Sequence, residues 1–170
     1  MMVILFYIAG VIALSATVLA LTRSNAAHAL IYLIVSLLAV AVLFFLMGAP
    51  FAAALEVLIY AGAIMVLFVF VIMMLNLGEA GIAQERSGLN PRHWIVPGGM
   101  AALLFAELLF ALQQQSAFTS GIAVSPKEVG ITLFGPYVLA VELASMLLLA
   151  GLVGAYHLGR RFIVRSGSDH

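Results

Sequence analysis

The chain has 170 residues, of which 65% are hydrophobic and only 8% are charged, and its mean hydropathy is +1.23. A soluble domain of this length cannot bury so much apolar surface, so the composition predicts an integral membrane protein. Seven Lys and Arg residues balance seven Asp and Glu residues, which argues against a basic patch for nucleic acid. The absence of cysteine excludes disulfides, thiol nucleophiles and Cys-ligated iron–sulfur clusters.

Five apolar stretches are long enough to cross the hydrocarbon layer of a bilayer, which is about 30 Å thick. In lipid they must be helices, because no water is present there to satisfy open strand edges. The first stretch has no basic residues before it, so we interpret it as a retained anchor and not as a cleaved signal peptide. We therefore expect an all-α integral membrane protein that forms a single membrane domain over residues 1–170. Its five transmembrane helices are expected at about residues 2–21, 26–47, 51–75, 95–112 and 137–158.

The connections between these stretches are of two kinds. Gly48, Ala49 and Pro50 predict a tight hairpin, with Pro50 suited to the first position of the next helix. Residues 76–94 and 113–136 are polar and contain Gly and Pro, so we expect loops there.

The basic residues predict the orientation of the chain in the membrane. Six of the seven fall on one side of the predicted topology, and only Lys127 falls on the other. The six are Arg23, Arg86, Arg92, Arg160, Arg161 and Arg165. Because Lys and Arg are enriched in cytoplasmic loops, this pattern places the N-terminus outside and the C-terminus in the cytoplasm.

The third stretch carries the most informative polar residues. Between Phe51 and Leu75 the only polar side chains are Glu56 and Tyr60, which lie one turn apart on one face of a regular helix. A helix of this length would reach roughly 37 Å at 1.5 Å per residue, so it must tilt, kink or bulge. An acid at mid-bilayer costs about 2.5–3.5 kcal/mol, and no Lys or Arg lies inside any predicted span.

Two interpretations are open for each of these polar groups. Glu56 is either a proton-handling group, which we favour, or a residue that hydrogen-bonds across a helix interface. Tyr60 either bridges this acid to water or is an ordinary core tyrosine. Gly62, between Ala61 and Ala63, either allows close helix packing or lowers the cost of a local change in winding such as a π-bulge. At Gly62 the residues alone favour close packing.

Glu142 in the fifth span and His28 at the start of the second are secondary polar candidates for proton movement. The alternative for Glu142 is an interhelical hydrogen bond, and the alternative for His28 is that it is a polar residue at the membrane interface. Glu107 lies close enough to the end of the fourth span to reach water, and we assign it no role. No His pair has the spacing of a zinc or haem site and no Gly-rich phosphate loop is present, so we expect no metal and no cofactor in this chain.

Three segments resemble a known family. The third span reads EVLIYAGAIMVLFVFVIMML from Glu56 to Leu75 and closely resembles the signature helix of the J subunit family of bacterial proton-pumping NADH:quinone oxidoreductase, respiratory complex I. The segments HALIYL from His28 and ITLFGPYVLAVELASMLLL from Ile131 fit the same family. The likeness extends from about residue 5 to residue 160.

The resemblance implies a non-redox subunit of a proton-translocating enzyme in the bacterial inner (plasma) membrane. Such a subunit lies in the membrane arm, between the quinone-site subunit and the antiporter-like subunits, and its partners bind flavin, iron–sulfur clusters and quinone. Its third helix has a π-bulge whose winding opens and closes a water path that connects quinone chemistry to proton movement. On this chain the implied bulge comprises Tyr60, Ala61, Gly62, Ala63, Ile64 and Met65, with Glu56 and Tyr60 beside the path. The resemblance therefore reverses the preference at Gly62.

Two other functions remain open. A small membrane subunit of a multisubunit cation/proton antiporter would have a similar composition and shares ancestry with this arm of complex I. An assembly scaffold with no part in proton movement is the third possibility.

Overall fold

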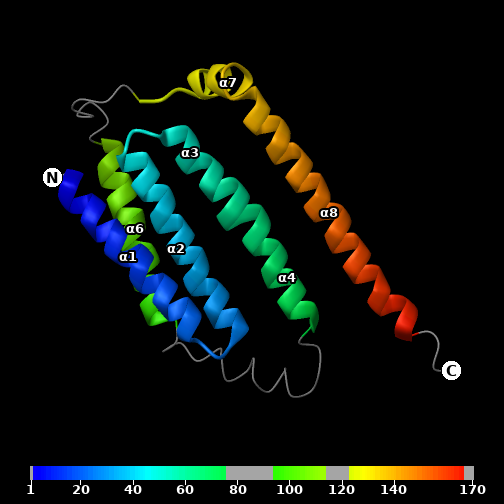
Figure 1. The fold of residues 1–170 in the computed structure, drawn as a ribbon. Coiled ribbons are helices and arrows are strands. Elements are labelled where there is room, and N and C mark those ends of the chain that lie inside the picture. The colour runs from blue at the N-terminus through cyan, green and yellow to red at the C-terminus, as the bar shows by residue number, and fades with distance from the viewer. Residues whose placement is uncertain (1, 76–93, 114–122, 167–170) are drawn as a thin grey trace. The chain divides into compact units, whose positions relative to one another are not determined.

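The computed structural model describes residues 2–75, 94–113 and 123–166 (Figure 1). All secondary structure in these residues is helical, which confirms the predicted class. The helices are α1 (Met2–Thr22), α2 (Ala26–Leu46), α3 (Pro50–Leu55), η1 (Glu56–Ile64), α4 (Met65–Leu75), α6 (Ile95–Gln113), α7 (Pro126–Phe134) and α8 (Val138–Ser166).

Five helices are long and apolar enough to cross a membrane, as predicted. They are Met2–Thr22, Ala26–Leu46, Pro50–Leu75, Ile95–Gln113 and Val138–Arg160, and the third consists of α3, η1 and α4 in sequence. Arg86 and Arg92, on which part of the predicted orientation depends, lie outside the described residues. The chain divides into two compact units, Met1–Ser125 and Pro126–His170, and each is described by itself. The expectation of a single membrane domain stays a prediction.

Helix α2 is the centre of the first unit, because it contacts α1, α3, η1, α4 and α6 (Figure 1). Alanines let the backbones of α1 and α2 approach closely, as small residues do in membrane proteins. The buried cluster consists of Ala9, Ile12, Ala13, Ala16, Val35, Ala39, Val42 and Leu104. Most large apolar side chains of α4 and α6 are exposed, which fits helices whose outer faces meet lipid or other proteins.

A pair of hydroxyl groups joins α1 to α2 inside this unit. The Ser36 Oγ lies 2.7 Å from the Thr17 Oγ1, and both are within 3.0 Å of the Ala13 carbonyl oxygen. Each hydroxyl has one hydrogen, so one donates to the Ala13 carbonyl while the other donates to its neighbouring hydroxyl. Ser36 is 5% exposed, so this network is closed to lipid.

The predicted hairpin between α2 and α3 is confirmed. Gly48 has φ +82°, a conformation that favours glycine. The amide of Ala49 donates to Phe44 O at 3.0 Å and the amide of Gly48 donates to Phe45 O at 3.1 Å, which is the Schellman pattern that closes a helix end. Pro50 then occupies the first turn of α3.

The second unit contains a helix that we predicted as loop. Helix α7 occupies Pro126–Phe134 within the segment expected to be irregular. Its start has a proline and an acidic residue, Glu128, in the first turn, both typical of a helix N-terminus. Gly135 follows its end, where an added Cβ would lie 2.7 Å from Ile131 O. The loop prediction was wrong here because we interpreted the Pro and Gly residues as breakers and not as helix boundaries.

The hydroxyl pair gives a first testable prediction. Ser36→Ala removes the hydrogen bonds between α1 and α2, and such interhelical bonds contribute about 0.6–1.7 kcal/mol. We expect the substitution to lower the temperature at which the protein aggregates in its own membrane. Ser15→Ala is the matched control, because the Ser15 hydroxyl donates only to Val11 O and Ile12 O of its own helix. Equal effects of the two substitutions would contradict the interhelical role.

Candidate functional site

The third membrane helix changes its winding part of the way along its length. Residues Glu56–Ile64 form the π-helical segment η1, whereas α3 before it and α4 after it are α-helical. The amide of Met65 contacts Tyr60 O, five residues earlier, which is the pairing that defines a π-helix. The expected departure from a regular helix is therefore present in this helix.

The extent of η1 differs from the expected bulge. Tyr60, Ala61, Gly62, Ala63 and Ile64 all lie within η1, whereas Met65 is the first residue of α4. The π-helical segment also begins four residues earlier than expected, at Glu56. The acid is therefore part of the irregular segment and not a residue outside it.

Gly62 has a direct physical role in this winding. A Cβ atom added at Gly62 would lie 3.0 Å from Val57 O, the carbonyl five residues earlier, which is closer than ordinary contacts of Cβ atoms. A side chain at this position would therefore press on the backbone turn that i→i+5 pairing creates. Glycine avoids the contact, which explains why the small residue stands here.

The π-helical winding also shifts Tyr60 relative to Glu56 around the helix axis. In an α-helix the repeat is 3.6 residues, so Tyr60 would lie on the face of Glu56. The wider π turn places the stacking position between Tyr60 and Ala61. Ala61 is 9% exposed whereas Tyr60 is 51% exposed, and Glu56 is half-buried. No hydrogen bond joins Glu56 to Tyr60 within the described residues, so the predicted pair is close in sequence but not directly bonded.

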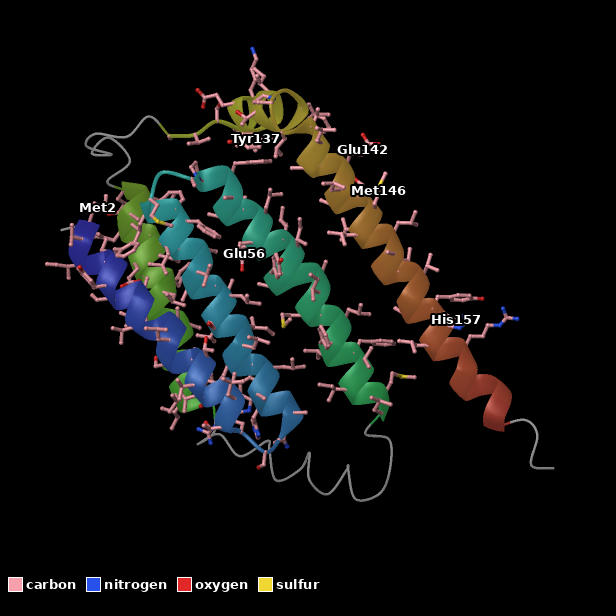
Figure 2. All side chains as sticks on the ribbon, viewed as in Figure 1. Met2, Glu56, Tyr137, Glu142, Met146 and His157 are labelled. Carbon is pink, nitrogen blue, oxygen red and sulfur yellow. The ribbon has the colours of Figure 1, made fainter. Side chains whose placement is uncertain are left out.

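Glu56 lies in the part of the third helix that packs beside α2 (Figure 2). It is six residues after Pro50, so it lies roughly 9 Å from the start of this helix. A carboxyl group there can bind and release a proton, and the phenol of Tyr60 can donate or accept a hydrogen bond. These are the chemical capacities that a proton path requires.

His28 lies far from this segment. Asn25 caps α2 by accepting from the amides of Ala27 at 2.9 Å and His28 at 3.3 Å, which places His28 in the first turn. Along α2 the histidine is 18 residues before Leu46, about 27 Å at 1.5 Å per residue, and so about 18 Å deeper than Glu56. The structure does not bring these two candidates together. Nearby, the guanidinium carbon of Arg23 lies 5.2 Å from the centre of the Tyr32 ring.

Glu142 belongs to the second unit. It is exposed on α8 (Figure 2). With Val138, Val141 and Ser145 it lines a hollow of about 370 Å³. The Ser145 hydroxyl donates to Val141 O at 2.9 Å within the same helix. A role for Glu142 in proton movement stays a prediction.

Glu107 is the polar residue that sequence reasoning placed wrongly. It is 4% exposed, so the expectation that it reaches water is wrong. Leu104 and Ala111, three residues before it and four after it on the same face of α6, are also buried. The reason is that this face packs against α1 and α2, and the distance of a residue from a helix end does not reveal which face it occupies.

No group of three or more His, Cys, Asp or Glu side chains is arranged to hold a metal ion within the part of the chain that the structure describes.

Comparison with known proteins identifies relatives of this chain. It is 58% identical over 156 residues to NADH-quinone oxidoreductase subunit J of Escherichia coli. The alignment covers 91% of this chain and 85% of that protein. It is 57% identical over 158 residues to the subunit J of Pseudomonas aeruginosa, with 92% and 95% covered. For the subunit J of Buchnera aphidicola subsp. Schizaphis graminum the identity is 51% over 158 residues, with 91% of this chain and 96% of that protein covered.

A family model points to the same group of proteins. The model described as NADH-ubiquinone/plastoquinone oxidoreductase chain 6 matches residues 16–158, which include all of η1 and the five helices α2, α3, α4, α6 and α7. The resemblance noted in the third span is therefore confirmed. The chain belongs to the chain 6 family of NADH-quinone oxidoreductase, and its bacterial relatives above are subunits J of that enzyme.

Proposed function

We propose that the protein is a membrane-arm subunit of a proton-pumping NADH:quinone oxidoreductase in the bacterial inner membrane. It couples electron transfer from NADH to quinone with proton translocation, and it binds no redox group itself. Flavin, iron–sulfur clusters and quinone belong to partner subunits, including the quinone-site and antiporter-like subunits. Family membership and the five apolar helices support this proposal.

The proposed orientation has the N-terminus outside and the C-terminus in the cytoplasm. In that orientation Glu56 lies in the outer half of the membrane, because the third helix starts at Pro50 on the outer side. Arg160 then lies at the cytoplasmic end of the fifth span.

The single observation that supports a gating role is the π-helical segment around Gly62. Changing i→i+5 pairing to i→i+4 pairing removes the equivalent of one inserted residue. All residues beyond the segment then rotate by about 100° and move by about 1.5 Å along the axis. We propose that these two windings make and break a hydrated chain past Glu56 and Tyr60. Both windings keep backbone groups hydrogen-bonded, which the hydrocarbon environment requires.

Gly62→Val tests the winding. The new Cβ would press on Val57 O, and overpacking of this kind costs about 1–3 kcal/mol. A cost of that size lowers the population of the π-helical form roughly 5- to 150-fold. We expect fewer protons pumped per NADH oxidised, measured by dye quenching and NADH absorbance in the same vesicles, while the complex still assembles.

Gly10→Val is the matched control for this experiment, because nothing lies within 4 Å of a Cβ added at Gly10 of α1. Pumping in Gly62→Val equal to that of the control would remove the gate from the mechanism.

Glu56→Gln and Tyr60→Phe test the proton path. Glutamine keeps the shape of the side chain and loses the ionisable proton, and phenylalanine keeps the ring and loses the hydroxyl. We expect both substitutions to reduce the ratio of protons pumped to NADH oxidised, more strongly for Glu56→Gln. Normal pumping by both variants in a fully assembled complex would instead support the assembly-scaffold alternative.

Purification in mild detergent tests the proposed partners. A subunit of NADH:quinone oxidoreductase should co-purify with chains that carry flavin and iron–sulfur clusters, detected by their absorbance and by mass spectrometry. A subunit of a cation/proton antiporter should co-purify with no such chains, and that result would favour the antiporter alternative.

A further inference from the structure

Glu107 is buried in the first unit without a partner for its charge. Both carboxylate oxygens lack a hydrogen bond to any of the described residues, and the residue is 4% exposed. It shares its face of α6 with Leu104 and Ala111, and this face packs against α1 and α2. Since its own chain covers it almost completely, a neighbouring subunit cannot supply a counter-charge unless these helices separate.

The helices packed against α6 bring no cation to Glu107. The only titratable side chain of α1 is Tyr7, which is 67% exposed. The titratable side chains of α2 are His28 and Tyr32, and both lie toward the opposite end of the helix. Glu107 is six residues from the end of α6, about 9 Å, whereas Tyr32 is 14 residues from the corresponding end of α2, about 21 Å.

The environment therefore favours the neutral form of the Glu107 carboxyl. An ionised carboxylate buried without a cation, a hydrogen-bond donor or water carries a large free-energy penalty. A protonated carboxyl avoids most of that penalty because it carries no net charge. Alanines of α1 and α2, including the fully buried Ala9 and Ala39, are part of this core. Their methyl groups cannot donate a hydrogen bond to the Glu107 carboxyl.

We propose that Glu107 is a buried proton-binding site whose bound proton holds α6 packed against α1 and α2. Loss of the proton creates a carboxylate that needs water, and water reaches it only when α6 separates from the other two helices. Opening of this core is thus coupled to the release of one proton, so the opening equilibrium rises with pH by up to about tenfold per pH unit. This site is separate from Glu56 and does not depend on the π-helical segment.

The chain has no cysteine, so a single introduced thiol can report this opening. Ala111→Cys places the thiol at a position that is 0% exposed, one turn beyond Glu107 on the same face. The rate at which N-ethylmaleimide modifies this thiol is measured in native membranes by mass spectrometry of this chain. The modification rate measured with Glu107 present is divided by the rate measured with Glu107→Gln. Because both proteins carry the same thiol, this ratio removes the pH dependence of the thiol itself.

We expect this ratio of rates to rise with pH, by up to about tenfold per pH unit. Glu107→Leu should behave like Glu107→Gln, because neither side chain titrates. Glu107→Asp should retain the dependence on pH, because it keeps a carboxyl group at this position.

A ratio that does not change with pH would overturn the proposal. Faster modification with Glu107→Gln and Glu107→Leu at every pH would also overturn it, because the carboxyl would then stabilise the core independently of its proton. If Ala111→Cys prevents assembly, Ala9→Cys on α1 is the second reporter, since it is fully buried in the same core. The measurement does not use pumping, so it is independent of the proposed gate.

Discussion

The hydrocarbon layer provides no hydrogen bonds, and this constraint explains most of the structure. Every backbone amide and carbonyl inside the membrane must be paired within the protein, so the spans are helices. The same constraint explains why α2 ends in a Schellman pattern at Gly48 and why the Ser36 and Thr17 hydroxyls share the Ala13 carbonyl. It also explains why a change in winding takes the form of i→i+5 pairing, because a simple break would leave amides and carbonyls unpaired.

The third helix combines this constraint with a second one, the packing of its two ends. Ala53 before the π-helical segment and Ala61 and Met65 near its end are all buried in the first unit. The extra residue in the wider turn adjusts the rotation between these contacts. A regular helix over the same residues would present a different side of α4 to α2. A change in the winding of η1 therefore also changes the packing of α4 against α2.

Hydropathy and residue spacing predicted the number of spans, the hairpin at Pro50 and the class of fold, because these depend on length and on local turn chemistry. The position of η1 was predicted only in part, and only from the family resemblance, because at Gly62 the residues alone favoured close packing. Gly62 marks the tight backbone contact, but Val57, Leu58 and Ile59 are ordinary membrane residues that do not show where the π pairing begins. The burial of Glu107 was not predictable, because apolar residues surround α6 on all sides and no polar face reveals which side packs inward. The sequence thus indicates how deep a residue lies but not the direction in which it points.

The carbonyl oxygen of Gly48 accepts a hydrogen bond from the amide of Val124 at 3.0 Å, beside the glycine turn and the proline that begin the third helix. This hydrogen bond therefore holds the start of the third helix in place, while the other end of the helix continues into Asn76. When one end of a helix is held, a change of winding in its middle turns the half beyond it and shifts that half along the axis, so α4 would move against α2. The exposed side chains of Val66, Phe68 and Phe70 would turn with α4, whereas the hairpin at Gly48 would stay in place.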